Sequence, residues 1–222
     1  MPAAPSSSRC PPASRTGYYL AGADGSVYAY GPGAALYGSL AGQALKTPIV
    51  GMATAAGGGY WLVAADGTVF PFGPGAGYFG SMANKRLNFP IVGMAAAPGG
   101  GYWLVASDGG IFSFGPGAAF YGSTGGIRLN RPVVGMAAVP GGGGYWLVAS
   151  DGGVFSFGPT ATFYGSTGSV RLNRPMVGMA SLPAPGYRLA SADGGVFDFG
   201  PGAAFFGSAA SGIVPAPVVA IS

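Results

Sequence analysis

Short apolar runs separated by glycine- and proline-rich turns repeat along the chain from residue 17 onward. The element Gly-aromatic-x-Leu begins at five glycines that are spaced 42, 42, 43 and 42 residues apart: Gly17, Gly59, Gly101, Gly144 and Gly186. The copies that start at Gly101 and Gly144 are identical at 32 of 40 positions, so they must adopt one conformation. A period of this length is typical of the blades of a β-propeller.

Each copy contains four apolar runs that are too short to form helices. In the clearest copy we expect strands at residues 133–138, 145–149, 154–157 and 163–166. Asp151 and Gly152 lie between the second and third runs, and this pair is typical of a tight two-residue hairpin in which both positions adopt or tolerate positive φ. The pattern therefore predicts an all-β fold with four antiparallel strands per blade.

The phase of the repeat predicts how the two ends of the sheet array meet. No copy of the run VVGMAA precedes Gly17, whereas Val218–Ser222 (VVAIS) is similar to that run. We expect this segment to pair with the strand near Tyr18 and to close the ring, because closure removes the exposed edge of an open array. The sequence thus predicts a single five-bladed β-propeller at residues 17–222, after a disordered or extended tail at residues 1–16.

The first strand of each copy carries a small residue next to a methionine or isoleucine. The small residues are Gly51, Gly93, Gly135, Gly178 and Ala220, and their neighbours are Met52, Met94, Met136, Met179 and Ile221. Small residues suit strands that crowd around a narrow axis. We therefore expect these strands to be innermost, with the methionines filling the core.

The composition indicates a folded chain. Although 45 Gly and 20 Pro would suggest low complexity, 49% of the residues are hydrophobic and 13% are aromatic. The uncharged stretch from Thr47 to Ala65 has the length of a membrane span, but it contains three successive glycines and recurs with the repeat. We therefore expect no membrane insertion.

The titratable side chains argue against an enzyme. The chain has no histidine and six acidic residues, five of which are the hairpin aspartates Asp24, Asp66, Asp108, Asp151 and Asp193. We interpret these five as turn-forming residues. Asp198 stands where neighbouring copies have a serine, and we interpret it as a solvated or locally hydrogen-bonded variant. A single carboxylate cannot form the acid-base pair that such catalysis needs. With only Cys10 besides, we expect no metal site and no cofactor.

The run GYWLVASDGGIFSFG, followed by FYGSTGG, LNRP and VVGMAA, resembles a repeat of secreted and surface-associated actinobacterial proteins. Its four-strand unit is similar to the blades of five-bladed tachylectin-type lectins. The resemblance covers the chain from Gly17 onward and implies an extracellular or cell-surface location. The family usually has Asp-Ala after FG, whereas this chain has FGPG or FGPT, so no ligand role of that aspartate is carried over.

Most basic side chains occur in the linking loops, by which we mean the connections from the last strand of one copy to the first strand of the next. These are Lys46, Lys85, Arg86, Arg128, Arg131, Arg171 and Arg174. In a closed propeller the linking loops share a face with the Asp-Gly hairpins. We expect a solvated, partly salt-bridged rim there.

The linking loops also suggest a ligand site. Aromatic residues precede Gly-Ser at the start of each connection (Tyr37, Phe79, Tyr121, Tyr164 and Phe206), and asparagines follow downstream in three copies. Sugar recognition combines an apolar platform with a few fixed polar groups, and repeated weak sites bind avidly. We therefore predict a multivalent, lectin-like module for a glycan or cell-wall polysaccharide, with the site residues Tyr121, Asn130, Arg131, Tyr164, Asn173 and Arg174.

Other interpretations remain open. Trp61, Trp103 and Trp146 are expected to pack between blades rather than to stack on ligands. A protein-interaction or surface-assembly scaffold without sugar binding is the alternative function, and we expect a monomer or a weak oligomer. Polyanion binding ranks last, nucleic acid included, because the basic excess of +4 is small.

Overall fold

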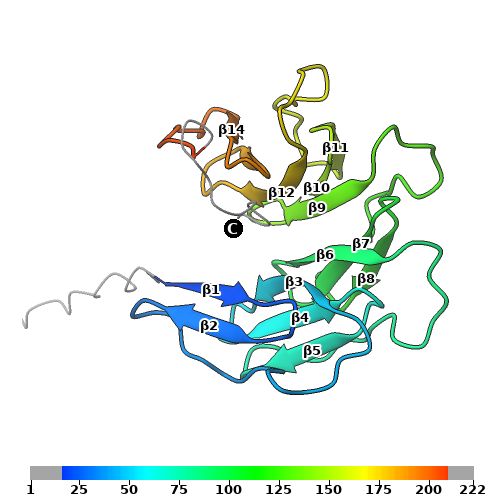
Figure 1. Cartoon of the computed structure of the whole chain (residues 1–222), viewed down its shortest axis with the longest axis vertical. Coiled ribbons are helices and arrows are strands. Elements are labelled where there is room, and N and C mark those ends of the chain that lie inside the picture. The colour runs from blue at the N-terminus through cyan, green and yellow to red at the C-terminus, as the bar shows by residue number, and fades with distance from the viewer. Residues whose placement is uncertain (1–16, 210–222) are drawn as a thin grey trace, which may run out of the picture.

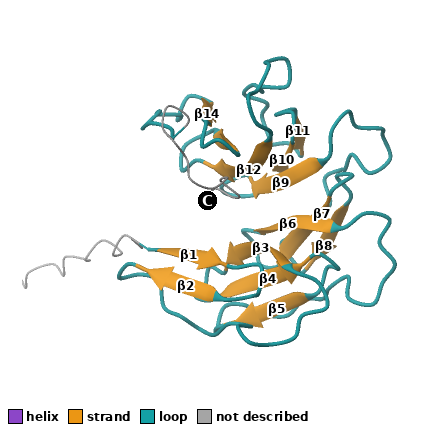
Figure 2. Cartoon of the chain, viewed as in Figure 1, coloured by secondary structure: helices purple, strands orange, loops and turns teal. Residues whose placement is uncertain are grey.

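The computed structural model describes residues 17–209, and this part of the chain contains β-strands and no helix (Figures 1 and 2). The strands are β1 (Tyr18–Ala21), β2 (Val27–Tyr30), β3 (Ile49–Thr54), β4 (Tyr60–Ala64), β5 (Val69–Phe72), β6 (Ile91–Ala96), β7 (Tyr102–Ala106), β8 (Ile111–Phe114), β9 (Val133–Ala138), β10 (Tyr145–Ala149), β11 (Val154–Phe157), β12 (Met176–Ser181), β13 (Tyr187–Ser191) and β14 (Val196–Phe199). The predicted all-β class is confirmed. The stretch from Thr47 to Ala65 contains β3 and β4, and within residues 17–209 no helix is long and apolar enough to span a membrane.

The strands form five antiparallel sheets, one per copy of the repeat. The first sheet pairs β1 with β2, and the others are β3-β4-β5, β6-β7-β8, β9-β10-β11 and β12-β13-β14. The sheets follow one another around an arc, with the first and the last at its two ends (Figure 1). The segment Val218–Ser222, which we predicted to pair with β1, and the predicted tail at residues 1–16 lie outside the described residues.

The prediction of four strands per blade is wrong for the described residues, because the fourth apolar run forms no strand. The reason is visible at residues 163–166. Gly165 has a φ of +133°, which interrupts the extended backbone. The Tyr164 N–H donates to the hydroxyl of Tyr187 in the next sheet, and that hydroxyl donates to the Gly165 carbonyl. These backbone groups therefore bond to a side chain rather than to a neighbouring strand.

The innermost strands β3, β6, β9 and β12 lie side by side around the centre of the arc. A Cβ atom added to Gly51 would lie 3.2 Å from the Cα of Gly93, and one added to Gly135 would lie 3.3 Å from the Cα of Gly178. These positions therefore leave little room for a side chain. Met94 and Met179 beside them are buried. The prediction of small residues and core methionines around the axis is confirmed for β6, β9 and β12, whereas Met52 of β3 is half-buried.

The hairpin between the second and third strands has a three-residue loop. In the fourth copy the Gly152 N–H donates to the Ala149 carbonyl and the Ala149 N–H donates to the Gly153 carbonyl. Gly152 has a φ of +81°, whereas Asp151 is not among the residues with positive φ. The predicted two-residue turn is therefore wrong, since a three-residue loop needs only its last residue in the left-handed region.

The hairpin aspartates act as turn residues, as predicted. Each side chain accepts a hydrogen bond from the backbone N–H two residues later, at 2.9–3.2 Å. This bond holds the loop in its turn conformation without help from another copy. The five residues are Asp24, Asp66, Asp108, Asp151 and Asp193.

Adjacent sheets pack through an aromatic pair that repeats at each of four contacts. The ring centroids lie 5.0–5.3 Å apart in the pairs Tyr19–Tyr60, Trp61–Tyr102, Trp103–Tyr145 and Trp146–Tyr187. The tyrosine named second in each pair is fully buried, and the tryptophans are at most 3% exposed. The tryptophans therefore pack between sheets, as we predicted.

A side chain of the second strand also ties each sheet to its own outer segment. It donates a hydrogen bond of 2.8–3.0 Å to a backbone carbonyl sixteen residues later in all five copies. The donors are Tyr19, Trp61, Trp103, Trp146 and Arg188. The position of the donor is thus kept while the residue type changes.

Arg188 brings a partner that the other copies lack. Its Nη2 donates to Asp198 Oδ2 at 2.9 Å, and Asp198 stands opposite Arg188 in the register of β13 and β14. The Asp198 side chain is only 5% exposed. Within residues 17–209 this is the one ion pair between side chains. Of our two interpretations of Asp198, the locally hydrogen-bonded variant is therefore confirmed and the solvated one is wrong.

Candidate functional site

The linking loops lie beside the Asp-Gly hairpins, as the repeat predicted. In the fourth copy the Thr167 N–H donates to the Gly152 carbonyl at 3.1 Å, and the Met176 N–H donates to the Ser150 carbonyl at 2.9 Å. Both ends of the linking loop are thus attached to the hairpin of the same copy. Equivalent bonds join Leu40 to Gly25 and Ile49 to Ala23 in the first copy. The loop between these fixed ends is where a cavity forms.

The fourth copy holds a shallow cavity of about 340 Å³ between its hairpin and its linking loop. The wall combines Asp151 from the hairpin with Leu172, Asn173 and Arg174 from the loop, and Arg131 enters from the preceding copy. This set offers two guanidinium donors, a carboxylate acceptor, an amide and an apolar side chain. It can hold a polar ligand group against an apolar surface.

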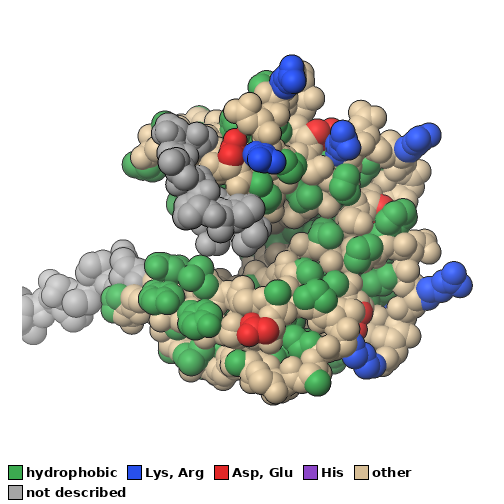
Figure 3. Space-filling view, viewed as in Figure 1, with side chains coloured by type: hydrophobic (Ala, Val, Ile, Leu, Met, Phe, Trp, Pro, Cys, Tyr) green, Lys and Arg blue, Asp and Glu red, His purple; other side chains and the backbone are tan. Residues whose placement is uncertain are grey.

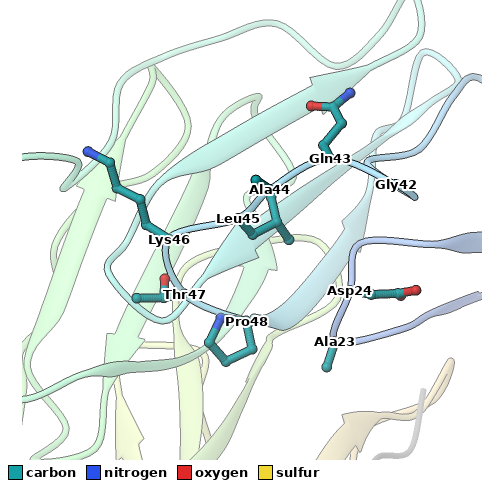
Figure 4. A pocket seen from close by; sticks show the side chains of 9 residues that line it. All are labelled: Ala23, Asp24, Gly42, Gln43, Ala44, Leu45, Lys46, Thr47 and Pro48. Carbon is teal, nitrogen blue, oxygen red and sulfur yellow. The ribbon is translucent and has the colours of Figure 1, made fainter.

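An equivalent cavity of about 570 Å³ lies in the first copy. Its wall includes Asp24 from the hairpin and Leu45, Lys46 and Thr47 from the linking loop (Figure 4). Among the residues that line this cavity, the side chains of Asp24 and Lys46 lie at opposite ends, with Leu45 between them (Figure 4). The same place in the repeat therefore forms a cavity in both the first and the fourth copy, with different charged groups.

The basic side chains of the linking loops are exposed and unpaired. All seven cations are exposed, and none lies within ion-pair distance of a carboxylate in the part of the chain that the structure describes. Figure 3 shows Lys and Arg side chains spaced along the outside of the arc, with Asp side chains between them. The prediction of a partly salt-bridged rim is therefore wrong for the described residues, although the rim is solvated.

Two of the cations, Lys46 and Arg174, still influence the hairpin carboxylate of the following copy. The hydrogen bond from the Ser191 hydroxyl is the largest cause of the lowered pKa of Asp193, and the positive charge of Arg174 also lowers that pKa. Burial raises the pKa of Asp66, but hydrogen bonds from Thr68 and Thr47 and the charge of Lys46 outweigh it, so the pKa is lowered. Lys46 and Arg174 therefore each lie near a carboxylate without forming an ion pair with it.

The structure brings together three of the six predicted site residues. Arg131, Asn173 and Arg174 line the cavity of the fourth copy, whereas Asn130 is exposed and does not line it. Tyr121 and Tyr164 do not line it either.

Both tyrosines are half-buried and take part in the packing between sheets. Tyr121 lies 5.8 Å from the ring of Tyr145, and Tyr164 lies 6.0 Å from the ring of Tyr187. An aromatic platform beside the predicted polar groups is therefore not formed by these residues.

The sequence reasoning missed a set of exposed side chains at the outer edge of the sheets, which we call the perimeter residues. They occupy one position of the repeat in all five copies and are 56–63% exposed: Leu36, Tyr78, Phe120, Phe163 and Phe205. Each directly precedes one of the aromatic residues that we predicted as platforms. In an extended segment neighbouring side chains point to opposite sides, so this alternation was the available signal.

Comparison with known proteins shows the fold. No protein-family model and no curated protein matches the chain. Two solved structures of YCF48 are similar to it: YCF48 bound to D1 peptide, with 14% identity and a TM-score of 0.51, and YCF48 from Cyanidioschyzon merolae, with 13% identity and a TM-score of 0.52. The matches cover 80% and 82% of this chain and 58% and 66% of those chains. The chain therefore has a β-propeller fold and spans about three fifths of the length of these structures.

Proposed function

We propose that the protein is a non-catalytic scaffold that binds a protein partner along the outer edge of its sheets. The perimeter residues carry this proposal, because large apolar side chains occupy the same exposed position in every copy. Exposed apolar side chains that recur in a pattern mark interaction surfaces, and aromatic residues dominate the binding energy of such surfaces. The exposed cations of the linking loops favour a partner with acidic residues.

The rigid attachment of the perimeter residues supports the proposal. The carbonyl that directly precedes each of them accepts the hydrogen bond from the second strand, as Ala119 does from Trp103 before Phe120. The side chains are therefore presented from a fixed backbone, which lowers the entropy lost on binding. The likeness to YCF48, one structure of which is bound to a peptide, shows the fold alone but is compatible with a peptide-binding role.

Carbohydrate binding is the second candidate. The cavity of the fourth copy falls within the size range of small-ligand sites, roughly 300–1,000 Å³, and Arg131, Asn173 and Arg174 offer polar groups for a sugar. The resemblance to secreted actinobacterial repeats supports an extracellular or cell-surface location for either function.

We also propose that the propeller is a closed ring of five blades. Within residues 17–209 the first sheet lacks the innermost strand that the other four sheets have. The similarity of Val218–Ser222 to those strands supports this segment as the missing one.

The proposed function is tested by screening the purified chain against a random peptide array and a glycan array. We expect selected peptides to combine acidic with aromatic residues. The double variant Phe120→Ser, Phe163→Ser should bind these peptides at least about tenfold more weakly, since two central apolar anchors are lost. Binding of defined glycans without peptide binding would replace this proposal by the carbohydrate one.

A matched control separates the perimeter from exposed aromatic residues in general. Phe89 lies in a linking loop and is 50% exposed, compared with 61% for Phe120 and 56% for Phe163. Phe89→Ser should leave peptide binding within about twofold of the native chain, because a residue outside the contact contributes little. Equal losses from Phe89→Ser and Phe120→Ser would contradict the assignment of the interface to the perimeter.

A further inference from the structure

The cavity of the fourth copy is lined by two arginines from consecutive copies. Arg131 and Arg174 occupy the same position of the repeat, directly before the proline that precedes an innermost strand. The equivalent residues of the first two copies are Thr47 and Phe89. Both arginines line the cavity. Within residues 17–209, the third and fourth copies are the one pair of consecutive copies that both have an arginine directly before this proline.

The charges favour an anion in this cavity. Arg131 and Arg174 are exposed, and neither has a carboxylate within ion-pair distance in the described part of the chain. One oxygen of Asp151 in the wall is already engaged, because its Oδ1 accepts the Gly153 N–H at 3.0 Å. Two guanidinium groups and one carboxylate give +2 − 1 = +1 for the lining residues.

The cavity of the first copy provides the comparison within the same molecule. It is lined by one ammonium group, Lys46, and one carboxylate, Asp24, so its lining charges sum to +1 − 1 = 0. It also contains no arginine. Because the two cavities are equivalent in the repeat, the arginine pair, rather than the fold, distinguishes the fourth copy.

We infer that this cavity binds an acidic side chain of the partner protein, with the carboxylate held between Arg131 and Arg174. The planar guanidinium group matches the two oxygens of a carboxylate, and such charge-assisted bonds are stronger than neutral ones. Leu172 and Val170 in the same wall receive the aliphatic part of the side chain. The cavity has no aromatic lining residue on which a sugar ring could stack, which favours a peptide over a polysaccharide. The inference deepens the proposed function and rests on it.

The experiment measures binding of a fluorescent oligoglutamate peptide to the full chain by anisotropy. The double variant Arg131→Gln, Arg174→Gln is compared with Arg128→Gln, Arg171→Gln. Each removes two positive charges from the same two linking loops, but Arg128 and Arg171 do not line the cavity. We expect at least about a tenfold loss of affinity for the cavity pair and about a twofold loss for the control pair, since direct contacts outweigh long-range attraction.

Each other outcome is decisive. Equal losses from the two double variants would assign the binding to the diffuse charge of the rim and overturn the inference, as would an absence of binding to the native chain. Tighter binding of oligogalacturonate than of oligoglutamate would assign the cavity to an acidic polysaccharide instead. Urea unfolding of each variant confirms that it is folded.

The perimeter variants distinguish failure of the inference from failure of the proposed function. The double variant Phe120→Ser, Phe163→Ser should bind the peptides selected on the array more weakly. It should leave the affinity for oligoglutamate within about twofold of the native chain, since oligoglutamate has no apolar anchor. If only the arginine pair affects the selected peptides, the cavity stands and the perimeter proposal fails. If only the perimeter variant weakens binding of the selected peptides, the proposed function stands and the inference about the cavity fails.

Discussion

At the scale of the residue, one hydrogen-bond donor explains why the copies tolerate different side chains. The indole of Trp146 reaches a carbonyl sixteen residues later, and the guanidinium of Arg188 reaches the equivalent carbonyl in the last copy. The arginine brings a charge that the tryptophan lacks. Asp198 faces it across the sheet, where Ser156 faces Trp146. The change from tryptophan to arginine is therefore compensated by the change from serine to aspartate on the neighbouring strand.

This compensation predicts the stability of variants of the last sheet. Arg188→Ala should lower the free energy of unfolding by roughly 2 kcal/mol, because it leaves the nearly buried Asp198 carboxylate without its partner. Arg188→Trp, Asp198→Ser restores the residues of the third and fourth copies and should recover most of that loss. Urea unfolding measures both effects. A loss of less than about 0.5 kcal/mol for Arg188→Ala, the range of ordinary surface substitutions, would show that the ion pair is not needed.

At the scale of the element, each buried tyrosine joins two sheets. The hydroxyl of Tyr145 accepts the Tyr121 N–H at 3.2 Å and donates to the Gly122 carbonyl at 2.6 Å. Burial is the largest cause that raises the pKa of Tyr145, and the same holds for Tyr60, Tyr102 and Tyr187. The contacts between sheets thus depend on neutral hydroxyl groups.

The raised pKa values predict loss of stability in alkali. The stabilising effect of the four tyrosines is complete below the pKa of 10.0 of an unfolded tyrosine and is lost as the pH rises through their higher folded values. The free energy of unfolding should therefore fall above about pH 10. Urea titrations between pH 8 and 11 measure this, and Tyr145→Phe should make the decline shallower. An unchanged decline would assign it to other groups.

At the scale of the whole molecule, the first sheet presents an apolar face. Tyr18, Leu20, Tyr28 and Tyr30 are 46–55% exposed, and hydrophobic side chains gather over β1 and β2 (Figure 3). In the second sheet the equivalents of Tyr18 and Leu20 are Tyr60 and Leu62, which are 0% exposed. Tyr60 packs against Tyr19 of the preceding sheet. In a closed ring the last sheet would cover this face in the same way.

Closure can be tested by removing the segment that we propose as the missing strand. A chain that ends at residue 216 should have a lower Tm than the native chain by roughly 5 °C or more, because the first sheet would lose its innermost strand and a ΔΔG of 1 kcal/mol corresponds to a few degrees. A synthetic peptide of residues 215–222 should restore part of the loss, whereas a scrambled peptide should not. An unchanged Tm would contradict closure by this segment.

The repeat period was sufficient to predict the all-β class, the sheets and the innermost strands, because turns and small residues recur at fixed positions. It did not predict that the fourth apolar run forms no strand. That outcome depends on the Tyr187 hydroxyl, which bonds to the backbone N–H of Tyr164 and the carbonyl of Gly165 in the preceding copy. For the same reason the sequence did not predict that Tyr164 packs against the ring of Tyr187. Arg131 and Arg174 were predicted from their place in the linking loop, and the structure brings both to the cavity of the fourth copy, whereas their role in binding stays a prediction.

If the arginine pair binds an acidic group, as we infer, the repeat accounts for how the pair arose. The third and fourth copies are identical at 32 of 40 positions, and each has its arginine at the same place. Tandem duplication of a blade with a single arginine is enough to set two of them around one hollow, without any point mutation. A selective pocket can thus originate as a by-product of lengthening the gene.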